Sequence, residues 1–132
     1  MKNDSTLLCI CGSKKIKKHC CQLYIQGEAY PKTPEKLMRS RYTAFTLGSN
    51  GQYLLDTWLP SMTQGLSVEE LSLSSTTWVG LELLHKSQSG DDACVEFNAS
   101  FIDADEKEKL HHENSVFKRI AGKWLYVGGE VS

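Results

Sequence analysis

The chain has 132 residues, of which 40% are hydrophobic and 23% are charged, so we expect one domain with a packed core and a small appendage. The net charge of −1 argues against a strong general attraction to nucleic acid or membranes. The charge is uneven, because residues 1–22 hold five lysines and one aspartate, whereas the remainder has ten basic and fifteen acidic residues.

Four of the five cysteines lie within residues 9–21, "CICGSKKIKKHCC". No apolar run is long enough for a signal-peptide core or a membrane span, so we expect a cytoplasmic protein, in which disulfides do not usually persist. Thiolates are soft ligands, and zinc takes four of them in a tetrahedron. We therefore predict one structural zinc ion held by Cys9, Cys11, Cys20 and Cys21. A redox pair or a vicinal disulfide is the alternative interpretation.

The spacing of these cysteines predicts a compact local structure. Cys-x-Cys places two side chains on one side of an extended chain, and Gly12 permits a sharp turn. Ser13 is the expected cap of a short helix through "SKKIKKHCC". His19 is a rival ligand, but four cysteines complete the shell and leave no open position for catalytic water. Cys94 lies in an apolar strand and is expected to be a small core residue.

The cysteine segment is also the basic part of the chain. Four thiolates and one Zn²⁺ together carry −2, which leaves residues 1–22 at +2. A candidate partner-binding surface is formed by Lys14, Lys15, Lys17 and Lys18. Such a surface suits an acidic protein, for example a chaperone or a component of the translation or secretion machinery, and RNA is a further candidate. A solvated lysine face without a partner is the plainer interpretation.

Residues 9–21 resemble the SEC-C motif, a zinc module also found at the C-terminus of the SecA translocation ATPase. The motif often has proline where this chain has Ile10, a second glycine where it has Lys14, and an aromatic residue where it has Ile16. The resemblance implies zinc binding by the four cysteines and favours an interaction with another protein.

Residues 23–33 are expected to form a connector, and a helix is expected over residues 34–47. Thr33 is its predicted cap, Pro34 suits the first turn, and Gly48 ends it. Arg41 falls in the middle of the apolar face of this helix, where a charge needs a partner. Three roles are possible for Arg41. It is part of an ion pair, it lays its aliphatic portion over the core with the guanidinium group in water, or it binds an anion in a pocket.

Two shorter helices are expected next, at about residues 50–58 and within "SVEELSLSS", where Ser67 and Glu70 match a capping box. The hydrophobic period then changes to two, which predicts four strands within residues 77–131. In the first, Val79, Leu81 and Leu83 alternate against Trp78, Gly80 and Glu82. In the second, one face is formed by Ala93, Val95, Phe97, Ala99 and Phe101.

The expected fold is α+β: a zinc-binding motif, then a cone-shaped domain of three helices on a curved antiparallel sheet of four strands. The order of elements resembles the nuclear-transport-factor-two-like, or cystatin-like, fold. Further resemblance, to the YchJ-like family of bacterial proteins, lies in "KLMRSRYTAF", "TWLP", "TWVGL", "HENSVF" and "GKWLYVGG". It covers nearly the whole chain, and we predict the motif at residues 1–24 and the cone-shaped domain at residues 25–132. The family implies this fold and metal but no assigned activity.

A cone-shaped domain often encloses a cavity between its sheet and helices. The candidate lining residues are Arg41, Tyr42, Trp58, Trp78 and Glu113. Core packing is the plainer role for the aromatic residues. Glu113 shares a strand face with His111 and, if that face is inward, is a candidate partner for Arg41.

The sequence contains no recognised catalytic motif, and we assign no catalytic residue, although a dyad of His111 and Glu113 is an alternative. The favoured function is a protein-interaction or adaptor module that acts through the basic zinc motif. The alternative functions are a small-molecule binder or enzyme that uses the pocket, and a zinc site that only fastens the N-terminus to the domain.

Overall fold

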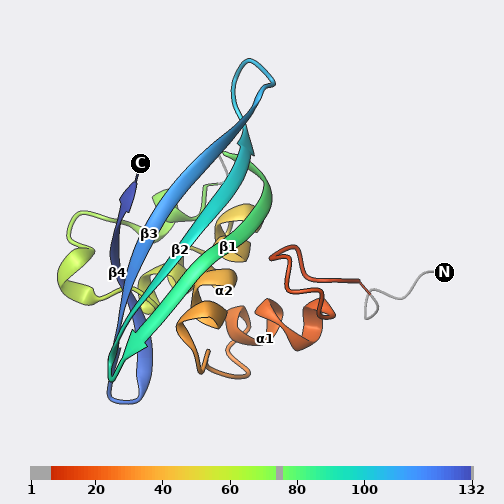
Figure 1. The fold of residues 1–132 in the computed structure, drawn as a ribbon. Coiled ribbons are helices and arrows are strands. Elements are labelled where there is room, and N and C mark those ends of the chain that lie inside the picture. Colours follow the sequence, from red (N-terminus) through yellow and green to blue (C-terminus); the bar gives the residue numbers. More distant parts are fainter. Residues whose placement is uncertain (1–6, 74–75, 132) are drawn as a thin grey trace.

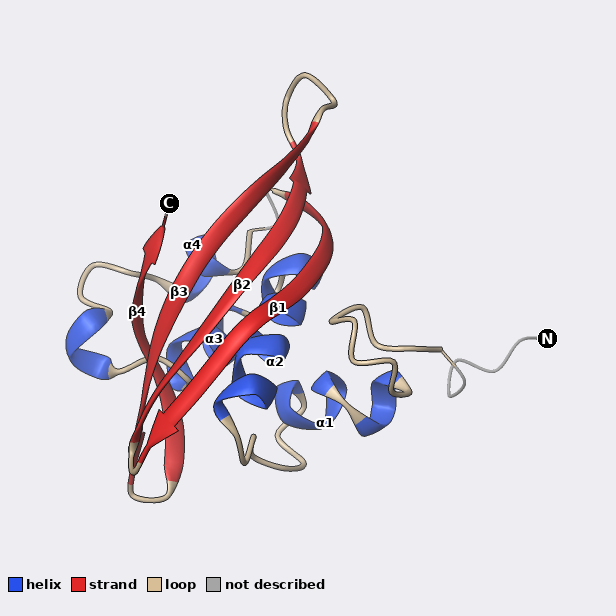
Figure 2. Cartoon of the chain, viewed as in Figure 1, coloured by secondary structure: helices blue, strands red, loops and turns tan. Residues whose placement is uncertain are grey.

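The computed structural model describes residues 7–73 and 76–131, and its centre is one antiparallel sheet with the strand order β1-β2-β3-β4 (Figure 1). The strands are β1 (Thr77–Ser89), β2 (Asp92–Ile102), β3 (Glu108–Ile120) and β4 (Lys123–Val131). The α-helices are α1 (Cys21–Ile25), α2 (Pro34–Leu47), α3 (Gly51–Asp56) and α4 (Val68–Leu71). The helices lie on one face of the sheet, as Figure 2 shows, which confirms the predicted α+β class.

The central helix α2 has the bounds that the sequence predicts. The Thr33 hydroxyl accepts a hydrogen bond from the Lys36 amide at 3.1 Å, and Pro34 occupies the first turn. Gly48, with a φ of +71°, ends the helix in a conformation that favours glycine. Leu37 and Met38 are buried against the sheet.

The two helices that follow are shorter than expected. α3 covers only part of the predicted residues 50–58, and α4 is a single turn. The Ser67 cap of α4 is confirmed, because its hydroxyl accepts from the Glu70 amide at 3.1 Å. The Glu70 carboxylate accepts from the same hydroxyl at 3.0 Å, so this half of the interaction differs from a standard capping box, in which it would accept from the Ser67 amide. The end of the stretch predicted as helix, residues 74–75, lies outside the described residues.

The prediction of a helix capped by Ser13 is wrong. Residues 8–16 form a small hairpin instead, in which Leu8 pairs with Ile16 and the Cys9 amide donates to the Lys15 carbonyl at 2.8 Å. A 3-10 turn covers Lys17–His19, and α1 begins at Cys21 and extends into residues 23–25, which were predicted as connector. A hairpin forms here in place of the predicted helix because the chain must reverse within a few residues to bring the two cysteine pairs together.

The inner face of the sheet is largely as predicted. On β2, Ala93, Val95 and Ala99 are buried, which confirms the alternation of that strand. On β3, Ser115 and Phe117 are buried. The prediction for β1 is partly wrong, because a register shift between Trp78 and Gly80 leaves Val79 51% exposed and turns the Trp78 ring toward the helices. A β-bulge of this kind reverses the inward and outward alternation of a strand.

Two groups of buried side chains hold the layers together. Leu37 and Met38 of α2 pack on Val95, Phe117 and other inward residues of the sheet, and Trp124 of β4 belongs to the same group. The second group joins the four cysteines to Tyr42 and Ala99. Each large apolar side chain buried in this way contributes about 1.5–3 kcal/mol. The N-terminal motif is thus packed on the body of the domain.

Within residues 7–73 and 76–131, no helix has the length and apolar character required to cross a membrane.

Candidate metal centre and pocket

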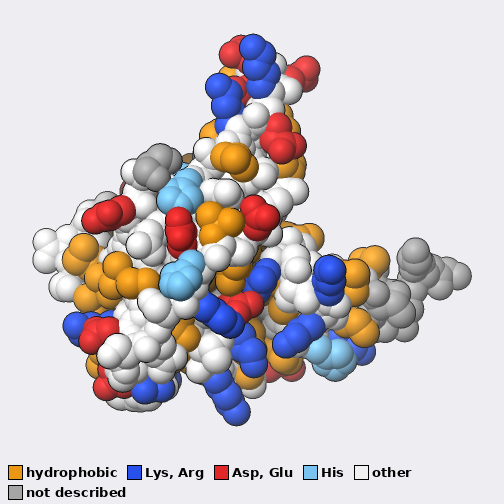
Figure 3. Space-filling view, viewed as in Figure 1, with side chains coloured by type: hydrophobic (Ala, Val, Ile, Leu, Met, Phe, Trp, Pro, Cys, Tyr) orange, Lys and Arg blue, Asp and Glu red, His pale blue; other side chains and the backbone are white. Residues whose placement is uncertain are grey.

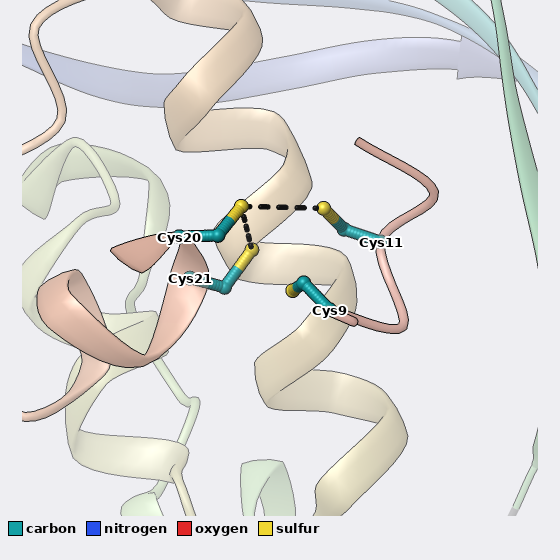
Figure 4. Close-up of side chains that lie close together, drawn as sticks. All are labelled: Cys9, Cys11, Cys20 and Cys21. Carbon is teal, nitrogen blue, oxygen red and sulfur yellow. Dashed lines mark hydrogen bonds between the residues drawn. The ribbon is translucent and has the colours of Figure 1, made fainter. Parts of the chain in front are cut away.

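The four clustered cysteines converge on one point, as Figure 4 shows. All four Sγ atoms lie within 4.8 Å of one another, and every one of the four residues is buried. Cys11 and Cys20 approach to 3.7 Å between sulfurs, and Cys20 and Cys21 to 3.9 Å. A tetrahedron of sulfurs around zinc, with bonds of about 2.3 Å, has edges of about 3.8 Å. The spacing of the thiols therefore fits a bound metal ion rather than a disulfide.

Local backbone geometry explains how adjacent cysteines reach the same point. Cys20 has a non-helical backbone with φ −129° and ψ −125°, and α1 begins at the next residue. The side chains of Cys20 and Cys21 therefore leave different kinds of backbone and converge. Gly12 has the positive φ, +82°, that the sequence predicted for the turn after Cys11.

Neighbouring residues hold this cluster in place. The Ser13 hydroxyl lies 3.1 Å from the Cys20 sulfur, and the Thr43 hydroxyl of α2 lies 3.9 Å from the Cys9 sulfur. Arg39 of α2 donates to the Cys11 carbonyl and pairs with Glu35 at 3.0 Å. This contact joins residues 28 positions apart in the chain, so only the tertiary structure brings Arg39 to the motif.

Crowding makes the thiols unequal when no cation is bound. Hydrogen bonds from Cys11 and Cys21 lower the pKa of Cys9. The hydrogen bond with Cys11 raises the pKa of Cys21, and burial adds to that rise. Four adjacent thiolates repel one another, and a divalent cation relieves this repulsion by favouring the ionised form of every ligand.

Neither the rival ligand His19 nor the fifth cysteine, Cys94, belongs to the cluster. His19 is exposed and lies on a neighbouring cleft. Cys94 is only half-buried, so its expected place in the core is not observed. Its position on β2 alternates with the buried residues Ala93 and Val95, which puts its side chain on the opposite face of the sheet.

The four lysines of the motif differ in exposure and in their relation to a nearby cleft. Lys14, Lys15 and Lys18 are exposed, and Lys17 is half-buried. Only Lys15 lines the cleft of about 350 Å³ between the motif, α2 and β1. The other charged residues there are Lys36, Arg39, Lys86 and Glu35, so the lysine, arginine and glutamate side chains of this basic cleft sum to +3. The candidate ligand Cys20 also lines the cleft. Figure 3 shows Lys and Arg side chains gathered where the motif meets the body.

A second, mostly apolar pocket of about 160 Å³ lies between α2 and the sheet, partly open to solvent. Four of the five predicted lining residues contribute to it, namely Arg41, Tyr42, Trp78 and Glu113. Trp58 does not line it but packs against the Tyr126 ring, with centroids 5.3 Å apart. The sequence analysis missed Tyr126 and Ser115 as polar lining residues, although their inward positions on β4 and β3 were open to prediction from strand alternation.

Arg41 is buried, at 5% exposure, and its partners are not the predicted one. Its Nη1 donates to the Leu54 carbonyl at 2.7 Å and to the Thr57 hydroxyl at 2.8 Å. The guanidinium carbon lies 4.7 Å from the Trp58 ring centroid and 4.6 Å from that of Tyr126. Burial lowers the pKa of Arg41 to about 10, so the side chain is still charged at neutral pH.

Glu113 accepts three hydrogen bonds within its own surroundings. His111 Nε2 lies 3.0 Å from one carboxylate oxygen, and the hydroxyls of Ser115 and Tyr126 donate to the other at 2.6 and 2.8 Å. Burial alone would raise the pKa of Glu113, but these hydrogen bonds outweigh burial and lower it. Among the described residues Glu113 makes no ion pair with Arg41, because its oxygens are already engaged and Arg41 points to the end of α3.

The fold and the cysteine cluster define a class of protein: a SEC-C motif joined to a nuclear-transport-factor-two-like domain. A SEC-C motif-containing protein from Rhodopseudomonas palustris has a solution structure with a TM-score of 0.87 and 30% identity to this chain, covering 96% of this chain and 99% of that protein. The crystal structure of a SEC-C motif-containing protein from Psychrobacter arcticus has a TM-score of 0.81 and 29% identity, covering 97% of this chain and 84% of that protein.

Sequence comparison gives the particular family. The profile of the "YchJ, middle NTF2-like domain" matches residues 33–129, and the chain belongs to this family. A UPF0225 protein of Photorhabdus laumondii is 38% identical over 130 residues, covering 94% of this chain and 80% of that protein. A UPF0225 protein of Haemophilus influenzae strain PittGG is 39% identical over 138 residues, covering all of this chain and 85% of that protein. The predicted boundary between residues 24 and 25 stays a prediction.

Proposed function

We propose that this protein is a zinc-binding interaction module of the cytoplasm, which uses the basic cleft beside its N-terminal motif to hold an acidic segment of another protein. The observation that carries the proposal is the excess of cations, four lysine and arginine side chains against one carboxylate, in a cleft whose walls come from the motif, α2 and β1. The rest of the molecule is acidic, so this positive potential is local and directional.

Zinc is the metal that suits this chemistry. Four thiolates in a tetrahedron are typical of structural zinc, and the observed sulfur spacings match the edges of such a site. The ion would order residues 9–21, which are too few to bury a core of their own. Its role is therefore to hold Lys15 and the turn around it against α2.

The cleft favours a carboxylate-bearing peptide over other occupants. Glu35 already pairs with Arg39 at 3.0 Å and with Lys86 at 2.7 Å, so the chain itself shows how a carboxylate sits between these cations. Lys15 and Lys36 make no ion pair among the described residues and stand on opposite walls of the cleft, on the motif and on α2. A second carboxylate, supplied by a partner, would pair with these two lysines.

A protein partner suits the surface better than RNA does. A nucleic acid tracks an extended basic stripe, usually with aromatic side chains on which bases stack. The basic cleft is short, its one aromatic residue is the half-buried Tyr24, and acidic side chains of the body would repel a polyanion that extended beyond it.

The test uses the zinc-loaded chain and a fluorescent glutamate-rich peptide, with binding followed by fluorescence anisotropy. Lys15→Glu combined with Lys36→Glu should reduce the affinity about tenfold or more, because two attractive charges become repulsive. Binding should also weaken as salt rises from about 50 to 300 mM. The matched control is Lys107→Glu with Lys109→Glu at the other end of the sheet, which makes the same charge change outside the cleft.

Two results would contradict the proposal. Equal binding by the cleft variant and the control variant would show that the contact is not local to the cleft. Tighter binding of a single-stranded RNA of matched charge would replace the protein partner with a nucleic acid. Metal analysis of the same samples should give about one zinc per chain. Finding another metal would change the proposed identity of the ion but not the proposal of an acidic protein partner.

A further inference from the structure

The pocket between α2 and the sheet shares no lining residue with the basic cleft, and it adjoins the cysteine cluster through Tyr42 and Ala99. Its volume of about 160 Å³ is close to that of a cavity of about 150 Å³ known to accommodate benzene. The walls are mainly aromatic, with Trp78, Phe97 and Phe117 among them, and the charged groups are Arg41 and Glu113. A pocket of this kind suits a flat apolar molecule with a few polar atoms.

Counting hydrogen bonds shows that part of Arg41 is without a partner. A guanidinium has five N–H donors. Nη1 bonds to Leu54 and Thr57, whereas Nε and Nη2 make no hydrogen bond within the described part of the chain. The rings of Trp58 and Tyr126 stack on the guanidinium and stabilise its charge, but a ring face accepts no hydrogen bond along the guanidinium edge.

Glu113 does not neutralise this charge by direct contact. Its two oxygens accept from His111, Ser115 and Tyr126, which is why the carboxylate is stable without a cation. The pocket therefore holds an internally satisfied anion and a buried cation whose remaining donors are unused. Leaving a buried cation without a counter-ion is costly unless some other group meets it.

We propose that this pocket binds a small aromatic or conjugated carboxylate, whose ring packs among the aromatic walls and whose carboxylate accepts hydrogen bonds from the unused donors of Arg41. Arginine presents its donors in a fork that matches a carboxylate. The Glu113 oxygen facing His111 receives one hydrogen bond there and can accept a second from a hydroxyl or amino substituent on the ligand.

A purely structural role for Arg41 makes a different prediction. Arg41 also fastens α2 to the end of α3 through Leu54 and Thr57, so its replacement lowers stability under either view. Only the binding role makes affinity depend on the charge of the ligand. The experiment therefore compares two probes of the same shape, benzoate and benzamide, on the unmodified zinc-loaded protein.

Binding is followed through the indole N–H resonances of the three tryptophans during titration. Trp78 lines the pocket, whereas Trp124 does not and serves as the internal control. We expect a saturable shift of the Trp78 signal with benzoate, with a Kd below about 1 mM, and at least about tenfold weaker binding of benzamide.

Two variants locate the site. Ala99→Leu fills the pocket from β2 while leaving Arg41 intact, and should abolish the saturable shift. Arg41→Met should weaken benzoate about tenfold or more and leave benzamide nearly unchanged. The matched control is Arg119→Met, because Arg119 also stacks on a tryptophan, 4.9 Å from Trp124, but lies outside the pocket.

We expect tighter binding of benzoate than of benzamide, loss of this binding in Ala99→Leu, and unchanged binding in Arg119→Met. Absence of a saturable shift with benzoate at millimolar concentration would overturn the proposal. Equal affinity for benzamide, or unchanged affinity in Ala99→Leu, would overturn it as well. Because the comparison of the two probes needs no variant, the test stands even if Arg41→Met fails to fold.

Discussion

Lys14 is a residue whose backbone conformation does not suit its side chain. It follows the turn at Gly12 and has a φ of +69°, in the left-handed region that glycine adopts most easily. The SEC-C motif often has a second glycine at this position. The hairpin of residues 8–16 thus holds Lys14 in a strained backbone conformation.

Replacing Lys14 with glycine should therefore raise the stability of the protein. We expect the free energy of unfolding to increase by about 1 kcal/mol, because the steric cost of a Cβ in this region disappears. Chemical denaturation of the zinc-loaded chain measures the change. Lys14→Ala is the control, since it removes the charge but keeps the Cβ, and a similar gain there would refute the conformational explanation.

Glu113 gives the protein a pH-dependent contribution to stability. Its pKa is lowered in the folded state from a reference of 4.5, so the carboxylate stabilises the fold at neutral pH. This contribution is present above about pH 4.5 and is lost as the pH falls through the lower folded value. We expect Glu113→Gln to flatten the stability profile below pH 4.5, as followed by urea unfolding.

The control for that experiment is Glu108→Gln, at the exposed start of β3. It should leave the profile parallel to that of the unmodified protein. Release of the metal in acid affects all three proteins alike, so the difference between profiles isolates Glu113. A profile of Glu113→Gln with the original slope would show that the three hydrogen bonds do not carry the effect.

Among the elements, α2 joins the sheet, the pocket and the N-terminal motif. Leu37 and Met38 face the sheet, Arg41 faces the pocket, and Arg39 and Thr43 meet the N-terminal motif. Neighbouring positions on a helix point about 100° apart, which is how one helix of this length serves three contacts. Loss of its first turn would therefore disturb the basic cleft, which includes Thr33 and Lys36.

Removing the cap of α2 should destabilise the protein measurably. Thr33→Ala leaves the Lys36 amide without its 3.1 Å partner, and we expect a loss of about 1 kcal/mol in the free energy of unfolding. Thr33→Ser keeps a hydroxyl and should recover most of that loss. If serine and alanine were equally destabilising, the effect would come from the threonine methyl group and not from the cap.

In the molecule as a whole, the cluster of four cysteines is part of the core. Cys9, Cys11, Cys20 and Cys21 share a buried group with Tyr42 and Ala99, so ordering of the motif and packing of the body support each other. A metal that binds only the folded state adds its binding free energy to the stability of that state.

Metal removal should consequently lower the melting temperature of the whole chain. At free zinc about a hundred to a thousand times the Kd, the loss amounts to roughly 3–4 kcal/mol. Thiol titration of the folded chain should find four of the five cysteines masked until a chelator is added. Cys21→Ser should lose the metal, whereas Cys94→Ser should keep it, and equal zinc content in both would contradict the assigned ligands.

The sequence by itself determined the features that depend on local order. The spacing of four cysteines, the cap and end of α2, and the alternation on β2 all follow from near neighbours and from periodicities of 3.6 and 2. The tertiary structure alone decided where the motif packs, why Val79 faces outward, and that Arg41 meets Leu54, Thr57 and two aromatic rings. Those contacts join residues far apart in the chain. A bulge in β1 likewise depends on its pairing with the neighbouring strand, which the local sequence does not show.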